Sequence, residues 1–262
     1  MTDYHVHTTV SPDAKSTYEQ YISRASLLGC DGICFTDHLD LGYSQKQVEN
    51  ADVISKMADF NKLKQEADVK VLKGIEVGFN KQTTDKTAEL LKAESFDYVI
   101  NSVHEVNGAD PYFEQYFREK DRKQAYGEYL EAVLASLDAP YDYSVVGHIG
   151  YVFRSAPYTE PVMQWREFPD LYDAILMKII YLGKGIEVNT SSFRYCDSTM
   201  PCMSVLRRYA ELGGEIITMG SDAHEVRRLC DGFEKTRQLL LSSGLKYLAE
   251  FKDMKPELNY IK

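Results

Sequence analysis

Histidines and carboxylates are the residues of this chain whose types and spacing could do chemistry. The 262 residues include only six histidines: His5, His7, His38, His104, His148 and His224. Imidazole and carboxylate donors without thiolates favour zinc, manganese or iron held for catalysis, whereas a structural zinc site more often recruits cysteine. Ions bound in this way can activate water for hydrolysis.

The spacing of these residues indicates shared ligation. His5 and His7 are separated by one residue, so on an extended strand both side chains point to the same face, and Asp222 and His224 repeat this spacing. Glu76 is a charge inside an otherwise apolar strand, which is costly unless it is paired or bound to metal. A lone histidine is more often structural, but the joint pattern predicts a metal centre.

Short β-rich runs alternate with segments of helical periodicity, which is typical of βα units around a parallel sheet. The predicted strands are 3–8, 32–36, 69–79, 97–106, 143–149, 185–190 and 215–220, and the predicted helices are 17–28, 45–67, 84–93, 112–137, 169–182, 200–212 and 226–242. Seven of each predict an α/β TIM-like barrel, with one domain over 1–262. Every histidine lies at or just beyond the carboxyl end of a strand, where barrels carry their active sites.

Composition excludes several other classes of protein. The net charge of −10 would repel a polyanion, so we expect no nucleic-acid partner. No apolar run approaches the ~18 residues of a membrane span, and the first residues lack the pattern of a secretory signal, so we expect a cytoplasmic protein away from the membrane. The five cysteines form no close pairs and are expected to be reduced and structural. The oligomeric state stays open.

Six short motifs, each weak alone, are specific together. They are Asp3-Tyr4-His5-Val6-His7, Thr36-Asp37-His38, Gly74-Ile75-Glu76, Ser102-Val103-His104, Gly147-His148-Ile149 and Gly220-Ser221-Asp222-Ala223-His224. With these motifs in family order, the chain resembles the polymerase and histidinol phosphatase (PHP) family over essentially its whole length. The resemblance implies a distorted seven-stranded (β/α)7 barrel with a trinuclear metal site.

The resemblance also implies a ligand set for two or three divalent ions, which could be zinc, manganese or iron. By the family pattern, the first ion would be held by His5, His7, Glu76 and Asp222, the second by Glu76, His104 and His148, and the third by Asp13, His38 and His224. Many family members have histidine where this chain has Asp13, although a carboxylate is also a competent ligand.

The monofunctional phosphatases of this family are the nearest pattern. They imply hydrolysis of L-histidinol phosphate to L-histidinol and phosphate, a step of histidine biosynthesis, through a hydroxide that bridges metals held by the catalytic carboxylates Glu76 and Asp222. Arg154 lies in the segment 151–168, which we expect to be an active-site loop, and Arg194 follows the sixth predicted strand. We predict that both arginines bind the phosphate, because a planar guanidinium can hold it through two hydrogen bonds, and that Glu105 meets the substrate amine.

Two further carboxylates adjoin the predicted ligands. Asp3 and Asp37 could each accept the second ring proton of a ligand histidine and so fix its orientation, or could merely cap a strand end. The acid that protonates the leaving group stays open between a metal-bound water, Asp13 and Asp222.

Other functions are compatible with the same barrel. A related phosphoesterase could act on a nucleotide, a phosphotyrosine or a nucleic-acid end, although the acidic charge weighs against a nuclease. A non-catalytic metal-binding barrel would be expected to lack ligands, yet each position carries a capable donor. A metal-dependent amidohydrolase would typically add a bridging lysine, and no strand end here offers one.

Overall fold

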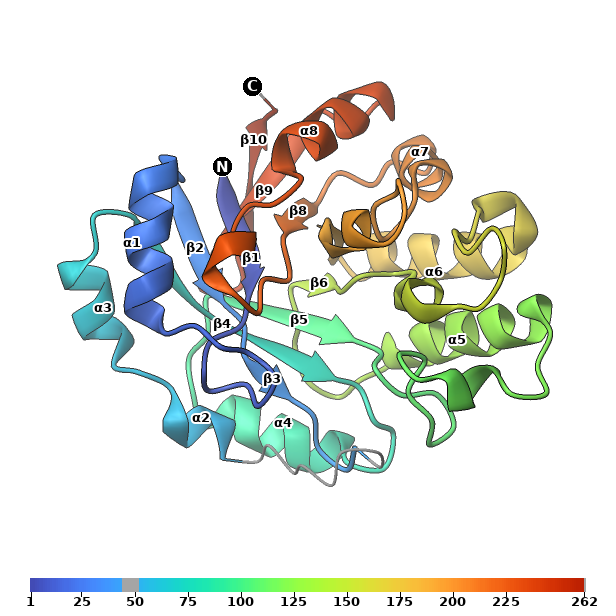
Figure 1. The fold of residues 1–262 in the computed structure, drawn as a ribbon, viewed down its shortest axis with the longest axis horizontal. Coiled ribbons are helices and arrows are strands. Elements are labelled where there is room, and N and C mark those ends of the chain that lie inside the picture. Colours follow the sequence, from blue (N-terminus) through green and yellow to red (C-terminus); the bar gives the residue numbers. More distant parts are fainter. Residues whose placement is uncertain (44–51, 262) are drawn as a thin grey trace.

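A barrel of parallel strands forms the centre of the molecule (Figure 1). The computed structural model describes residues 1–43 and 52–261. Neighbouring strands in the barrel follow the order β1 (Thr2–Val6), β2 (Gly32–Phe35), β4 (Lys70–Gly78), β5 (Tyr98–Ser102), β6 (Val145–Val146), β7 (Gly185–Asn189) and β8 (Ile217–Gly220). A short strand, β3 (His38–Leu39), pairs with the second half of β4. The predicted seven-stranded α/β barrel is confirmed, with β3 as an addition.

The first and last strands of the barrel meet at one end. β1 and β8 meet through a bridge between Val6 and Ala223, and the backbone N–H of His7 donates to the carbonyl of Ala223 at 3.0 Å. This contact lies at the carboxyl ends of both strands. We call that end of the barrel the mouth and the opposite end the base.

Helices cover the outside of the strands (Figure 1). They are α1 (Tyr18–Leu28), α2 (Val53–Lys56), α3 (Phe60–Glu66), α4 (Thr84–Lys92), α5 (Arg122–Ser136), α6 (Pro169–Tyr181), α7 (Met203–Glu211) and α8 (Phe233–Ser242). Local sequence sets their ends. Thr17 and Gln20 form a reciprocal capping box at the start of α1, and Gly29 ends that helix with a φ of 64°, a left-handed conformation that glycine adopts without strain.

Three predicted helices are interrupted. The part of the predicted helix 45–67 that the structure describes forms α2 and α3, and residues 44–51 lie outside the described residues. In 112–137, a 3₁₀ turn η1 (Glu114–Phe117) precedes α5, because Glu119 has a φ of 61° and Asp121 caps a new helix. In 226–242, the 3₁₀ turn η5 (Val226–Arg228) precedes α8, because Gly232 has a φ of 77°.

A hairpin that the sequence did not predict closes the base. It consists of β9 (Tyr247–Lys252) and β10 (Lys255–Tyr260), which pair antiparallel. The two turn residues both have positive φ, which suits the twist of a tight hairpin. Phe251 inserts beneath Tyr4 and Tyr98, and its backbone N–H donates to the Tyr4 hydroxyl at 2.8 Å. The barrel interior is therefore aromatic at this end.

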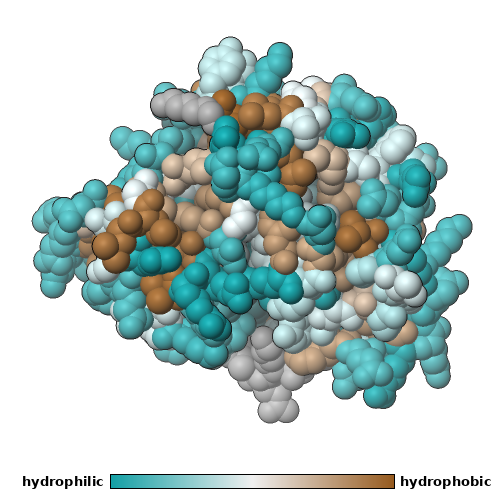
Figure 2. Space-filling view, turned by 45° about the horizontal axis from the view of Figure 1, so that its top comes forward, coloured by the Kyte–Doolittle hydropathy of each residue, from teal (hydrophilic) through white to brown (hydrophobic). Residues whose placement is uncertain are grey.

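The surface is mixed in character. Hydrophilic side chains cover most of the face in Figure 2, and hydrophobic ones lie between them in separate groups. None of the helices in the described ranges combines the length and apolar character that a bilayer crossing requires. All five cysteines are free thiols, and the Sγ atoms of Cys30 and Cys230 lie 3.1 Å apart.

Candidate metal and phosphate site

The predicted ligands converge at the mouth of the barrel. A cavity of about 320 Å³ opens there, and His5 and His7 lie fully buried at its floor. Its lining consists of Asp13, His38, Asp40, Tyr43, Glu76, His104, Asp110, Tyr112, His148, Tyr151, Arg154, Arg194, Asp222 and His224. Seven of the nine predicted metal ligands are therefore in the lining, and the other two are beneath it.

The first predicted ligand set surrounds one carboxylate oxygen. Glu76 Oε2 lies 3.3 Å from His5 Nε2 and 3.5 Å from His7 Nε2, while Asp222 Oδ1 lies 3.5 Å from His7 Nε2. The two histidine Nε2 atoms are 2.9 Å apart. His5, His7 and Asp222 thus offer donor atoms close enough to share one ion.

The second set uses the other oxygen of the same glutamate. Glu76 Oε1 lies 3.1 Å from His104 Nε2 and 2.8 Å from His148 Nε2. Ser102, which precedes His104 by two residues at the end of β5, donates its hydroxyl to the same oxygen at 2.8 Å. Glu76 consequently lies between the two sets, in the position of a bridge.

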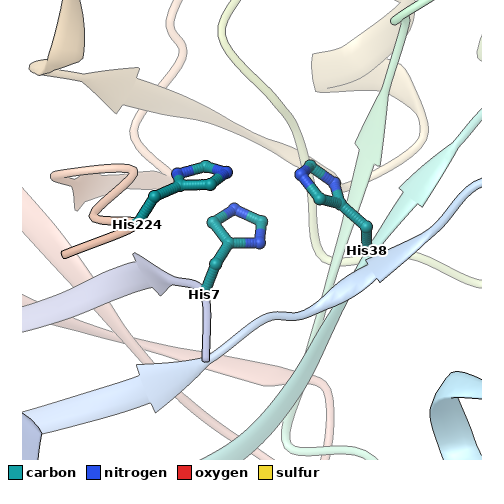
Figure 3. Close-up of side chains that lie close together, drawn as sticks. All are labelled: His7, His38 and His224. Carbon is teal, nitrogen blue, oxygen red and sulfur yellow. The ribbon is translucent and has the colours of Figure 1, made fainter. Parts of the chain in front are cut away.

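The third set lies nearest the solvent. The rings of His38 and His224 each stack on the ring of His7 with centroids 4.2 Å apart, and Figure 3 shows the three imidazoles around a common space. Asp13 Oδ1 lies 3.7 Å from His38 Nε2, and Asp13 Oδ2 lies 3.4 Å from His224 Nε2. The carboxylate is placed where it could complete a site with these imidazoles.

Two carboxylates fix the imidazoles from behind. Glu187 accepts a hydrogen bond from His5 Nδ1 at 2.5 Å, and Asp40 accepts one from His104 Nδ1 at 2.9 Å. With Nδ1 protonated, each Nε2 keeps its lone pair directed at the cluster. These pairs orient the rings for ligation.

Of the two alternatives for Asp3 and Asp37, ring orientation or capping, the structure shows capping. Asp37 accepts the backbone N–H of Thr8 at 2.7 Å, and Asp3 accepts those of Ser221 at 2.9 Å and Cys230 at 2.8 Å. Both carboxylates follow the capping alternative, because the loops after the strands turn their N–H groups toward them. They hold the backbone that carries the ligands.

The charged groups of the cluster shift one another's pKa values in both directions. Burial opposes the charge of Glu76 and Asp222, but His5 and other imidazoles outweigh it and hold the pKa of both carboxyls well below the usual range. Burial lowers the pKa of His7 well below its ordinary value, and the charge of His224 and His38 adds to this shift. Burial opposes the charge of His5, His38 and His104, but nearby carboxylates outweigh it and raise the pKa of each imidazole. The carboxylates and His7 are thus in their ligand forms, whereas these three histidines release a proton when a metal binds.

The two predicted phosphate-binding arginines lie on the wall above this cluster. Arg154 Nη1 is 3.6 Å from Asp222 Oδ2, and Arg194 Nη2 donates to the carbonyl of Ser221 at 3.1 Å. The Nε–H group of each arginine is buried and has no acceptor among the described residues. Such donors are costly to bury unless a ligand supplies an acceptor.

Glu105 is not in this pocket, so its predicted position is wrong. It lines a separate cavity together with Asn80 and Asn107. Although Glu105 directly follows His104, its side chain lines that other cavity while the His104 ring lines the metal site. A different carboxylate, Asp110, lines the pocket instead.

The motifs and this geometry agree with the comparison with known families. Residues 3–191 match the model of the PHP domain. The chain belongs to the PHP domain family. A probable histidinol-phosphatase of Clostridium acetobutylicum is 30% identical over 93% of this chain and 94% of that protein. The histidinol-phosphatase of Lactococcus lactis is 29% identical over 98% of this chain and 96% of that protein.

A solved structure resembles this PHP barrel along its whole length. It is the histidinol phosphate phosphatase of Lactococcus lactis in complex with zinc, L-histidinol and phosphate. The TM-score is 0.85 with 26% sequence identity, and the alignment covers 98% of each chain. The fold of the present chain is therefore that of a PHP-domain phosphatase.

Glu187 and Asp40 were not predicted as site residues of this PHP domain, although the sequence contains a pattern that marks each of them. Glu187 lies in Gly185-Ile186-Glu187-Val188, the same four residue types as Gly74-Ile75-Glu76-Val77, so it too is a charge inside an apolar strand. Asp40 follows His38 by two residues, the spacing that drew attention to Asp222 and His224. In both cases the pattern marked a partner of a ligand.

Proposed function

We propose that the protein is a metal-dependent histidinol-phosphatase that hydrolyses L-histidinol phosphate to L-histidinol and phosphate. One observation carries the proposal. The Nε–H groups of Arg154 and Arg194 are buried above a cluster of histidines and carboxylates, and neither has a hydrogen-bond acceptor among the described residues. An anion with several acceptor oxygens would satisfy both arginines at once. The relatives named histidinol-phosphatase support this substrate.

The donor set fits divalent metal ions. Glu76 Oε2 is buried and receives no hydrogen bond from the described residues, although imidazole nitrogens surround it. We propose the three ligand sets named above for two or three ions, with Glu76 as the shared ligand. Zinc is favoured by the complex of the Lactococcus lactis enzyme, and manganese or iron would suit the same nitrogen and oxygen donors.

The residues of the chain have distinct tasks in this hydrolysis. Divalent ions, when bound, supply an acidified water as the nucleophile and neutralise phosphoryl charge. Arg154 and Arg194 would bind the phosphoryl oxygens and stabilise the charge that develops on them in the transition state. Glu187 and Asp40 would keep the Nδ1 protons of His5 and His104 in place. The pocket is thereby organised before the substrate arrives.

The test is phosphate release by the purified protein reconstituted with zinc or manganese. L-Histidinol phosphate is compared with nucleoside monophosphates, phosphotyrosine and p-nitrophenyl phosphate at equal concentration. We expect a preference for histidinol phosphate of ~100-fold or more in kcat/KM, which corresponds to about 2.7 kcal/mol. Equal rates on all substrates would refute the substrate and leave a general phosphatase, and no release with either metal would refute the activity.

The proposed enzyme acts in histidine biosynthesis and in the cytoplasm. Its partner in the reaction is a small phosphate monoester, without nucleic acid. The net charge of −10 supports this choice, because it opposes binding of a polyanion, whereas two half-buried arginines suffice for one phosphate group.

A further inference from the structure

A buried carboxylate at the far side of the pocket has no part in the proposed metal site. Asp110 lies in the segment after β5, its side chain is almost fully buried, and it lines the same cavity as Arg154 and His148. It is separate from the ligand cluster in sequence. A buried charge in a ligand pocket needs a partner.

Neutral donors surround this carboxylate. The backbone N–H of Tyr112 donates to Asp110 Oδ1 at 2.7 Å, and the hydroxyl of Tyr151 donates to the same oxygen at 3.2 Å. The hydroxyl of Tyr43 donates to Oδ2. A carboxylate accepts about four hydrogen bonds, so three occupied positions leave room for one further donor.

The charge of Asp110 is not balanced by these contacts. Burial raises the pKa of Asp110 to about 6, and the charge of Asp40 adds to this shift, while the hydrogen bonds from Tyr112 and Tyr151 and the charge of Arg154 oppose it. The carboxylate is therefore mostly ionised above pH 7. Uncharged N–H and O–H donors stabilise the anion without neutralising it, which leaves the site complementary to a cation.

Tyr151 connects this carboxylate to the reaction centre. Its ring centroid lies 5.1 Å from that of His148 and 5.6 Å from that of His104, while its hydroxyl contacts Asp110. The Arg154 guanidinium lies over the ring of Tyr112 at 5.5 Å. The pocket thus has an anion-binding part around Arg154 and an anionic part around Asp110, and Tyr112 contacts both residues.

We propose that Asp110 binds the ammonium group of the substrate and selects amino-alcohol phosphates over phosphate esters that lack a cationic group. The inference rests on the proposed function, since it concerns the same pocket. L-Histidinol phosphate carries its amine on the carbon next to the phosphate-bearing carbon. Asp110 and Arg154 line the same cavity, and the charge of Arg154 acts on Asp110, so one small ligand with both charged groups can meet both residues.

The test is a cycle of two proteins and two substrates. Wild-type protein and Asp110→Asn are each assayed, after metal reconstitution, on L-histidinol phosphate and on its analogue in which hydrogen replaces the amine. We expect the wild type to prefer the amine by ~10- to 100-fold in kcat/KM, and Asp110→Asn to lose most of that preference. Asn has the shape of Asp, so the tyrosine hydroxyls can reorient around it. The cycle cancels effects on metal binding that both substrates share.

Matched variants make the cycle specific. Glu105→Gln removes a carboxylate that lines a different cavity, and it should keep the wild-type preference for the amine. Binding of L-histidinol and of its amine-free alcohol, measured by calorimetry on the metal-loaded proteins, should give the same ratio without turnover. If Asp110→Asn does not fold, Asp110→Ser replaces it in the cycle.

The outcomes separate the two proposals. An undiminished amine preference in Asp110→Asn, or no preference in the wild type, overturns the assignment of Asp110 and leaves the phosphatase activity standing. Absence of turnover of L-histidinol phosphate, with turnover of other esters, overturns the proposed substrate instead. In that case the same cycle is run with 2-aminoethyl phosphate and ethyl phosphate, and a loss of amine preference in the variant still supports Asp110.

Discussion

The two ends of the barrel differ in chemistry, and the end with the smaller cavity is the one that carries the candidate site. The cavity at the base, lined by Met1, Thr2, Tyr4 and the β9–β10 hairpin, has a volume of about 720 Å³, against about 320 Å³ at the mouth. The base holds none of the histidines, whereas the mouth holds all of them in its lining or floor. Convergent ionisable groups, and not volume, mark the site in this fold.

A single strand shows how the sequence builds this contrast. Along β5, alternate residues face the barrel interior, and they change from Tyr98 at the base through Ile100 to Ser102 at the mouth. His104 continues the series into the pocket. On the other side of the strand, Asn101 donates to the carbonyl of Ser136 in α5 at 3.0 Å. One strand therefore supplies packing at one end and ligands at the other.

The largest effect is expected from Glu76→Gln at the mouth. The substitution keeps the volume but removes the charge that lies between the two inner ligand sets. We expect kcat/KM to fall by at least ~10²- to 10³-fold, with loss of bound metal measured by mass spectrometry. Glu250→Gln, at the base cavity, is the matched control and should retain both. Normal metal content in Glu76→Gln would contradict its position as a bridge.

Phe251→Ala at the base is expected to lower stability and to leave activity unchanged. Phe251 is 1% exposed and packs against Tyr98 with ring centroids 5.1 Å apart. Its removal leaves a cavity under the barrel, and we expect the free energy of unfolding in denaturant to fall by about 3 kcal/mol or more. The kcat/KM of the molecules that remain folded should not change. A loss of activity without a loss of stability would show that the base and the mouth are coupled.

The sequence predicted the mouth better than the base for a physical reason. Metal ligands must be particular residue types at strand ends, so His5, His7 and Asp222 could be recognised from type and spacing alone. The hairpin at the base requires only a fit to the aromatic interior, and its turn, Asp253-Met254, lacks the glycine that usually signals such a turn. Packing of this kind depends on partners that are distant in the sequence.

Within the mouth, prediction failed where only the direction of a side chain decides. Glu105 was expected in the pocket because it adjoins His104, but it lines a different cavity. Asp110 lies in an irregular segment without periodicity, so nothing in the sequence indicated where its side chain points. The ligands were predictable from residue type, and the surrounding carboxylates depend on the three-dimensional path of the loops.

A smaller effect is expected from Arg154→Lys, which tests the anion-binding wall. Arg154 lies between the rings of Tyr112 and Tyr195, at 5.5 and 5.4 Å, and its buried Nε–H has no acceptor among the described residues. Lysine keeps the charge but loses the planar fork, so we expect kcat/KM to fall by about 100-fold. Arg122→Lys is the control, because Arg122 holds Glu167 and lies outside the pocket. Equal activity of Arg154→Lys and the wild type would remove this arginine from the phosphate site.

The smallest effect is expected from Glu187→Gln, which lies between the two ends. Glu187 accepts a hydrogen bond from His5 Nδ1 at 2.5 Å and another from the backbone N–H of His148 at 2.7 Å. It therefore orients the ring of one ligand and the backbone of another, and it does not touch the substrate. Glutamine can still accept one of these bonds but brings an N–H₂ group toward the other donor. We expect metal affinity, measured by competition with a chelator, to fall ~10- to 100-fold. Because the defect lies in ligand orientation, excess metal should restore much of the activity; a kcat that stays low at metal saturation would instead give Glu187 a role in the reaction itself.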